Sequence, residues 1–324
     1  MQVAAYIATR CGQAVLTLLC VSLVIFVSLR LLPGGFAEIM LGPLSTPEAK
    51  RYATEQYGLD GSAVTQYFSW LLTLLRGDFG LSLVTRGSIA TELLRRAPAT
   101  IELALLATLM ALCVGLPLGV ICGIRESGRP VRLLGRLIGA VGAGTPEFVL
   151  GSAALYLLSG WSMGFTARGF VSIFEAPTEN LKALAVPAAT LAVFGVSLIL
   201  RTTRDSVQRV LTEGHVLTPI ARGDRPATII LHHVLRNAAI PVLTVSSSFL
   251  GYLLGGAVIV EVLFSIPGVG LYVYNALNNR DYAVVQAGVM ISALVFVGIN
   301  AAVDIAYALI DPRVGNSTAR AGSA

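Results

Sequence analysis

Long apolar runs alternate with short polar segments along this chain, and that alternation predicts helices that cross a membrane. The first run, residues 11–29, has no charged side chain and lies between Arg10 and Arg30. A helix of about 20 residues crosses a hydrocarbon core of about 30 Å. Residues 30–34, RLLPG, follow the run where a signal peptide would have a small-residue cleavage site, so we expect an uncleaved first span.

Five further apolar runs predict an all-α integral membrane protein with six transmembrane helices. The loop after the second run, residues 125–136, holds four arginines, a density typical of the cytoplasmic side. With six spans, both chain ends are then expected to be cytoplasmic. The five runs cover residues 103–124, 137–160, 183–200, 237–260 and 284–309.

The segment after the first span predicts an extracytoplasmic helical insertion. A helix start is expected at residues 45–48, STPE, and a second helix from Ser62 to Arg76, stopped by Gly77. The apolar residues of the second helix follow the spacing of one helical face, which we expect to pack on the spans or lie at the lipid interface. A role in gripping a peptide is the weaker alternative. This face comprises Val64, Tyr67, Phe68, Leu71, Leu72 and Leu75.

The predicted organisation therefore has four parts. They are the N-terminus and first helix (1–32), the extracytoplasmic region (33–98), a five-helix core with a cytoplasmic loop at 201–236 (99–313), and a disordered tail (314–324).

Composition and charge support a membrane protein and exclude several other classes. The chain is 55% hydrophobic and 13% charged, whereas soluble domains have about 25% charged residues. Its net charge of +5 comes from arginines in short loops between spans, which favours membrane orientation over nucleic-acid binding. The four cysteines lie in predicted spans without a C-x-x-C pair, so we interpret them as small apolar residues and expect no metal site.

The stretch 201–241 is too polar to lie in hydrocarbon, because an ionised side chain at mid-bilayer costs about 2.5–3.5 kcal/mol. We therefore expect a loop in water. Gly214 and Gly223 are permissive positions, and Pro219 and Pro226 restrict the backbone around them. The residues between the glycines are expected to form a short helix along the membrane surface.

The sequence contains no catalytic constellation. It lacks the G-x-x-x-x-G-K-[ST] phosphate loop, the H-E-x-x-H zinc motif and the G-x-S-x-G nucleophile elbow. If the protein pumps, its energy must come from a partner, and we expect no cofactor in this chain. A membrane enzyme is accordingly the most distant alternative.

The polar stretch resembles the cytoplasmic EAA-type loop of bacterial ABC importer permeases, in the dipeptide/oligopeptide and nickel branch, B-type subunit. In that family the loop docks into a groove of a separate ATPase subunit. His215 replaces the usual tyrosine, and Pro219-Ile220 replaces a small-then-basic pair. The resemblance assigns ATPase coupling to Glu213, His215, Thr218, Ala221, Arg222, Gly223 and Pro226.

A second stretch, residues 255–283, resembles the G-x-V-x-V-E-x-x-F-x-x-P-G-x-G motif of the same family, followed by R-D-Y, and Asp304 and 311–313 match its closing motif. In the family the first of these motifs lies at the outer mouth. The resemblance places Glu261, Phe264, Pro267, Gly268, Gly270, Arg280 and Asp281 there.

The resemblance implies a type I ABC importer permease fold in the bacterial cytoplasmic (inner) membrane. The implied partners are a second homologous permease, two ATPases carrying ATP and Mg²⁺, an extracytoplasmic substrate-binding protein and membrane lipid. Di- and oligopeptides are the expected substrates, with nickel or another small solute as the alternative.

Three polar residues in or beside the predicted spans are candidates for lining the path: Glu147, Asn300 and Asp304. Pro146 can break the helix and leave Glu147 at membrane depth, where an acid is either functional or paired with a neighbour. A rival hypothesis uses Glu147 and Asp304 as proton sites of a secondary transporter. The chain shows no evident internal repeat, which weakens that rival.

Overall fold

The computed structural model describes residues 2–31, 61–124, 128–159, 170–225 and 228–310. Within these ranges the chain is helical apart from turns and one isolated antiparallel bridge between Leu81 and Ser88. The predicted all-α membrane architecture is confirmed. The expected helix start at 45–48, the tail at 314–324 and Pro226 lie outside the described residues.

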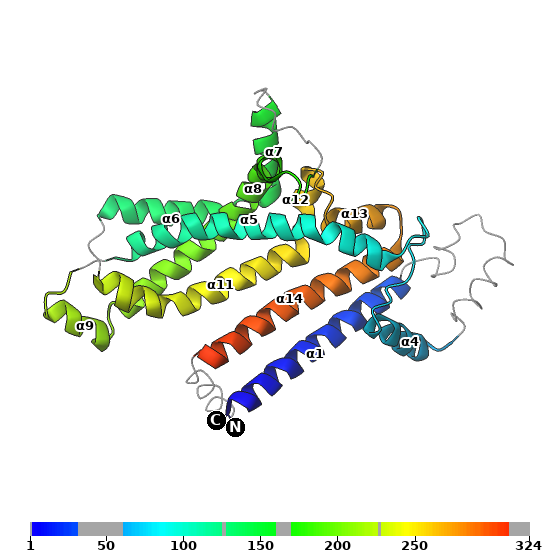
Figure 1. The fold of residues 1–324 in the computed structure, drawn as a ribbon, viewed down its shortest axis with the longest axis horizontal. Coiled ribbons are helices and arrows are strands. Elements are labelled where there is room, and N and C mark those ends of the chain that lie inside the picture. Colours follow the sequence, from blue (N-terminus) through cyan, green and yellow to red (C-terminus); the bar gives the residue numbers. More distant parts are fainter. Residues whose placement is uncertain (1, 32–60, 125–127, 160–169, 226–227, 311–324) are drawn as a thin grey trace.

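Five helices are long and apolar enough to cross a membrane. They run roughly alongside one another in Figure 1. Each contains most of one predicted span. They are α1 (Gln2–Arg30), α5 (Ile89–Gly123), α8 (Pro177–Val210), α11 (Leu235–Gly256) and α14 (Tyr282–Ile310).

The predicted third span, 137–160, is not one straight helix. It is divided between α6 (Arg129–Gly144) and α7 (Glu147–Ser159), which meet at an angle of 97°. Pro146 explains the break, because a residue before proline is disfavoured in the helical region and Thr145 is extended, with φ −96° and ψ 118°. Counting the bent pair as one span gives the predicted six.

The fourth span is longer than predicted, and the start of the expected loop is helical. α8 continues to Val210, so the charged residues from Arg201 to Arg209 lie on its last turns. Two of these arginines have partners: Arg204 pairs with Asp205 at 2.7 Å, and Arg201 donates to the Gly139 carbonyl of α6 at 3.1 Å. The polar composition indicated the end of the membrane segment, not the end of the helix.

Glycines bring α5 and α8 into close contact. Gly115, Gly119 and Gly123 recur every four residues on the face of α5 that packs against α8. A Cβ atom at Gly119 would lie 2.5 Å from the Thr203 Cβ and 2.8 Å from the Leu200 carbonyl oxygen. This is the small-residue packing that lets membrane helices approach backbone to backbone, and it makes these two helices one packed unit.

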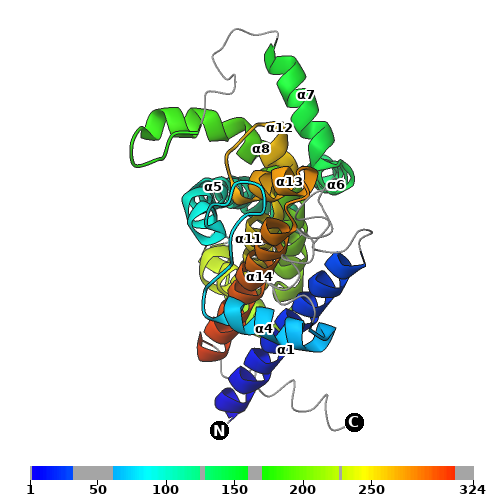
Figure 2. The same cartoon turned by 90° about the vertical axis from the view of Figure 1, so that its right-hand side faces the viewer.

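The helix α4 (Ala63–Leu75) confirms the prediction for residues 62–76. The Ser62 hydroxyl accepts the Thr65 N–H at 3.2 Å, and Gly77, with φ +78°, ends the helix. Its Tyr67 packs on Phe26 near the end of α1, where the rings are 5.3 Å apart. Figure 2 shows α4 crossing α1.

The remaining helices lie at the two ends of the bundle (Figure 1). One end, the α9 end, carries α9 (Gly214–Ala221) and the π-helix η1 (Ile229–Val234). The opposite end, the α13 end, carries α4, α12 (Val258–Leu263) and α13 (Val269–Asn278). The predicted fifth span ends earlier than expected, because the helix breaks at Ala257 between α11 and α12.

Candidate functional sites

The predicted surface helix is present as α9, and it is fixed to the bundle. Val216 is fully buried in a cluster with Val207, Val234 and Ala238. His215 lies within 3.3 Å of a Glu213 carboxylate oxygen and within 2.9 Å of the Asn237 amide of α11. α9 is therefore packed directly against residues of α8 and α11.

The other side of α9 is open. All the described residues that the sequence assigned to ATPase coupling are exposed, and they lie within one continuous segment. Two backbone bonds close its end, from Arg222 N–H to the Thr218 carbonyl and from Asp224 N–H to the Pro219 carbonyl, both 3.1 Å. Gly223 has φ +79°, a conformation that other residues rarely adopt. The exposed residues are Glu213, His215, Thr218, Ala221, Arg222 and Gly223.

The π-helix η1 was not predicted from the sequence. Its wide turns are rare and are often found at functional sites. Ile229 and Val234 bury its apolar side next to α9. The segment lies within the stretch that resembles the EAA-type loop, but no residue pattern in it distinguishes a π-helix from an ordinary helix.

At the α13 end, Glu261 caps a helix to which it does not belong. Its side chain is fully buried, and one carboxyl oxygen accepts the Thr100 hydroxyl of α5 at 2.7 Å while the other accepts the Leu271 N–H at 2.9 Å. Thr100 in turn accepts the Val269 N–H at 2.9 Å. The N-cap residue of α13, Gly268, has no side chain, so Glu261 and Thr100 satisfy N–H groups that would otherwise be orphaned.

Burial is the main influence on the Glu261 carboxyl group. It raises the pKa of Glu261, because a charged form is disfavoured away from water. The Thr100 hydroxyl, the N–H groups of Leu271 and Gly270, and the charge of Arg96 oppose this rise. The net direction is upward, so the folded protein holds this proton more tightly than an exposed glutamate does.

The two motif glycines are required by the same carboxyl group. A Cβ atom at Gly268 would collide with the Glu261 carboxyl, and one at Gly270 would lie 2.9 Å from the Glu261 Oε2 and 2.8 Å from the Val258 Cα. Two motif residues lie between Glu261 and Gly268 in the sequence. Phe264 packs against the main buried cluster, and Pro267 is half-buried. The P-G-x-G pattern is thus explained by close approach of the turn to α12.

Asp281 forms a second long-range brace, which here means a buried carboxyl group that binds two segments far apart in the sequence, as Glu261 does. It is 3% exposed and accepts the Ser82 hydroxyl together with the N–H groups of Leu83 (3.1 Å) and Val84 (3.4 Å). Arg280 turns the chain with φ +57° just before it. The turn between α13 and α14 is thereby tied to the turn that precedes α5.

The three candidate path residues have separate partners. Glu147 begins α7 at the bend, is half-buried and interacts electrostatically with Tyr252 of α11. Asn300 accepts the Ser248 hydroxyl at 3.1 Å, which joins α14 to α11. Asp304 lies 3.4 Å from Arg10 of α1. Among the described residues, no three His, Cys, Asp or Glu side chains are grouped to hold a metal.

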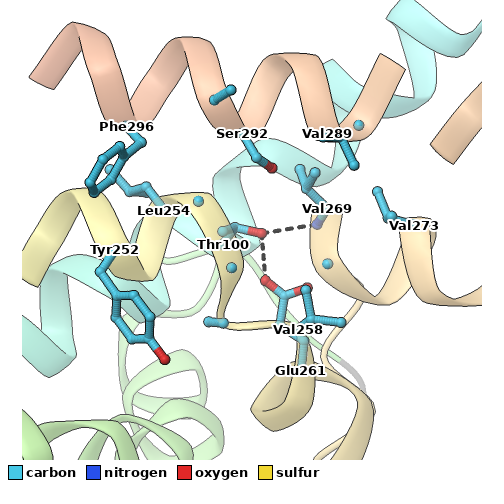
Figure 3. A pocket seen from close by; sticks show the side chains of 16 residues that line it. Thr100, Tyr252, Leu254, Val258, Glu261, Val269, Val273, Val289, Ser292 and Phe296 are labelled. Atoms are coloured by element: carbon cyan, nitrogen blue, oxygen red, sulfur yellow. Dashed lines mark hydrogen bonds between the residues drawn. The ribbon is translucent and has the colours of Figure 1, made fainter. Parts of the chain in front are cut away.

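A cavity of about 430 Å³ lies between α11, α13 and α14 (Figure 3). Glu261 and Thr100 lie at one side of it, and Tyr252 and Phe296 lie at the other. Apart from Thr100, its wall comes from residues 252–296. These residues lie on successive helices whose mutual packing no local pattern reveals, so sequence reasoning missed the cavity. The available clue was the group of wall glycines, Gly255, Gly256, Gly270 and Gly288.

Comparison with known proteins covers almost the whole chain. Residues 115–316 match the family "Binding-protein-dependent transport system inner membrane component", and residues 3–104 match the N-terminal part of that membrane component. The chain is 34% identical over 309 residues to "Probable peptide ABC transporter permease protein y4tP" of Sinorhizobium fredii, covering 95% of this chain and 98% of the relative.

Two other relatives have similar coverage. The dipeptide transport system permease protein DppB of Alkalihalophilus pseudofirmus is 33% identical over 330 residues, which cover 96% of this chain and 99% of the relative. The glutathione transport system permease protein GsiC of Salmonella paratyphi A is 32% identical over 312 residues, covering 95% and 98%. The chain therefore belongs to the family of inner-membrane permease components of binding-protein-dependent ABC transport systems.

Proposed function

We propose that this chain is a permease subunit of an ATP-driven importer of di- or oligopeptides, and that it forms half of the translocation path. Membership of the permease family supports the transport role, and the peptide, dipeptide and glutathione transport named for its relatives supports the substrate class. Nickel or another small solute remains the alternative cargo from the sequence resemblance.

The proposed assembly contains a second, homologous permease, two ATPases that hold ATP and Mg²⁺, and an extracytoplasmic binding protein. Both chain termini and the α9 end lie in the cytoplasm in this arrangement. A detergent pull-down of the tagged chain from its native host tests it. Co-purification of a second permease and ATPases is expected, whereas a chain recovered without ATPases after cross-linking would overturn the proposal.

The observation that carries the coupling proposal is the two-sided character of α9. One side is buried among α8, η1 and α11, and the other exposes the coupling residues. ATPase movement against the exposed side would reach the spans through Val216 and the contacts of His215.

Gly223→Arg tests the exposed side. Because φ at Gly223 is +79° and a Cβ there meets nothing within 4 Å, the variant strains the turn and projects a long cation into the docking surface. We expect the protein to remain in the membrane but to lose most ATPase co-purification and uptake. The matched control is Gly77→Arg, at φ +78° with an equally open Cβ at the α13 end. Normal ATPase association in the Gly223 variant would refute the docking role.

The secondary-transporter rival is tested by collapsing the proton gradient in membrane vesicles supplied with ATP. Uptake by an ATP-driven importer persists, whereas proton-coupled uptake stops. The structure does not favour the rival, because Asp304, one of its two proposed proton sites, is paired with Arg10.

A further inference from the structure

The cavity at the α13 end has the chemistry of an apolar side-chain pocket. We propose that it receives an apolar side chain of the transported peptide, with the peptide's terminal ammonium directed toward Tyr252 and Glu147. This inference rests on the proposed function and specifies which group of the substrate this chain recognises.

The size and wall of the cavity fit such an occupant. Its volume of about 430 Å³ lies within the range of about 300–1,000 Å³ found for small-molecule sites. Most of its wall is hydrocarbon, and the labelled side chains in Figure 3 surround a common space. The apolar wall side chains include Leu254, Val258, Val269, Val273, Val289 and Phe296.

The cavity also lies where a helix is broken. α11 ends at Gly256 and α12 begins at Val258, and both residues line the cavity. Irregular backbone in a membrane protein is tolerated where it is buried or borders a cavity, and transporters place substrate sites at such breaks. Gly256 leaves the wall open, because a Cβ atom there meets nothing within 4 Å.

The hydrogen bonding around α13 argues against an anionic occupant. The first residues of α13 line the cavity, and a helix N-terminus normally attracts anions. Here the N–H groups of Val269 and Leu271 are already bound by Thr100 and Glu261. The carboxylate of a peptide therefore finds no free donor among these groups, and a neutral side chain is the better fit.

The opposite side of the cavity supplies the polar contact. Tyr252 and Phe296 are 46% and 42% exposed, so this side is accessible. The Tyr252 phenol points away from Phe296 in Figure 3 and interacts electrostatically with Glu147. A carboxylate within electrostatic range of this side favours a cation, which in a peptide is the terminal ammonium.

Filling the cavity tests the proposal. In Gly256→Leu the new side chain occupies the open space, and Gly298→Leu is the matched control, since its Cβ also meets nothing within 4 Å and it is not a wall residue. Initial uptake of labelled phenylalanylglycine and diglycine is measured in vesicles from the native host, with ATP inside and the extracytoplasmic binding protein added outside. We expect Gly256→Leu to lower phenylalanylglycine uptake by about tenfold or more and diglycine uptake far less, because only the phenyl ring needs the cavity.

Further variants separate the possible failures. Ala293→Leu fills the same cavity from α14 and should give the same selectivity if Gly256→Leu does not fold. Glu147→Gln should lower uptake of free phenylalanylglycine while leaving the residual uptake of its N-acetyl form unchanged. Equal losses for both dipeptides in the cavity variants, or no loss, would overturn the inference.

Two outcomes concern the assembly. If wild-type vesicles transport neither these dipeptides nor longer peptides with and without phenylalanine, the proposed function fails and this inference fails with it. If Gly256→Leu, but not Gly298→Leu, loses the second permease in a pull-down, the cavity is filled by that partner and only this inference is overturned.

Discussion

At the scale of single residues, Glu261 stabilises the α13 end because each of its two carboxyl oxygens accepts a hydrogen bond, whereas a glutamine has only one side-chain oxygen. We expect Glu261→Gln to lower the free energy of unfolding by about 1–3 kcal/mol, because one of the buried donors now bound to the carboxyl group loses its acceptor. Thermal unfolding in detergent measures the change. The control is Glu179→Gln, which removes an exposed pair with Lys182 worth about 0–1 kcal/mol. Equal stability of the two variants would contradict the brace.

The same residue predicts a pH dependence. The pKa of Glu261 in the folded protein is raised above its ordinary value of 4.5, so the folded state binds this proton more strongly. This contribution to stability is full below the unfolded pKa and is lost as pH rises through the folded pKa. The melting temperature of the wild type should therefore fall relative to that of Glu261→Gln as pH rises above about 4.5. A difference that does not change with pH would contradict this.

The residue scale also shows what sequence reasoning found and what it missed. The motif containing Glu261, Gly268 and Gly270 was visible, but its physical cause was not. Gly268 is glycine because Glu261 approaches it, and Glu261 is placed there by Thr100, which is 161 positions earlier. The pairing of Asp281 with Ser82 spans 199 positions and carries no local pattern.

At the scale of elements, α4 has three different sides. Tyr67 and Trp70 are on the side that faces α1, and polar residues such as Thr65 and Ser69 are on a second. The third side is apolar and exposed, with Val64, Phe68, Leu72 and Leu75 at 64%, 56%, 55% and 75%. α4 crosses α1, whose own surface is apolar and largely exposed (Figure 2). The sides match a helix that lies in the membrane interface.

Spin labels on α4 test this placement in reconstituted membranes. Labels at Phe68 and Leu72 should be accessible to dissolved oxygen but not to a water-soluble nickel chelate, because oxygen partitions into hydrocarbon. Labels at Thr65 and Ser69 should show the reverse and serve as the matched controls. If both reagents fail to reach Phe68 and Leu72, protein covers this side and the lipid contact is wrong.

Element boundaries were predictable where local chemistry decides them. Ser62 and Gly77 delimit α4 as expected, because caps act within one turn. The length of α8 was underestimated because charge marks the membrane boundary and helices continue into water. Pro146 indicated a break, but the 97° angle depends on how α6 and α7 pack against other elements.

At the scale of the whole molecule, α1 is attached to the bundle mainly through α14, with Arg10 and Asp304 forming an ion pair between them. We expect Arg10→Glu to lower stability by about 1 kcal/mol, because two acids then face each other in a partly exposed site. The double variant Arg10→Glu with Asp304→Arg should recover most of the loss in thermal unfolding. No recovery would show that the two charges do not interact.

The same pair bears on transport. If Asp304 only anchors α1, Asp304→Asn should keep most ATP-driven uptake. A proton site at Asp304 would instead make that variant inactive.

The six-span architecture itself was predictable from hydropathy, because each span must satisfy its backbone internally. The attachment of α1 was not, because exposed apolar helices carry no mark of their neighbour.

The two long-range carboxyl braces have a consequence for biogenesis. Ser82 and Thr100 leave the ribosome early, whereas Asp281 and Glu261 follow about 160 to 200 residues later. Until then the turn before α5 has no acceptor and α13 does not exist. The contacts that hold the α13 end together can therefore form only after most of the polypeptide has been synthesised and inserted. A chain truncated before residue 281 lacks the hydrogen bonds of Asp281 and keeps only those of Glu261.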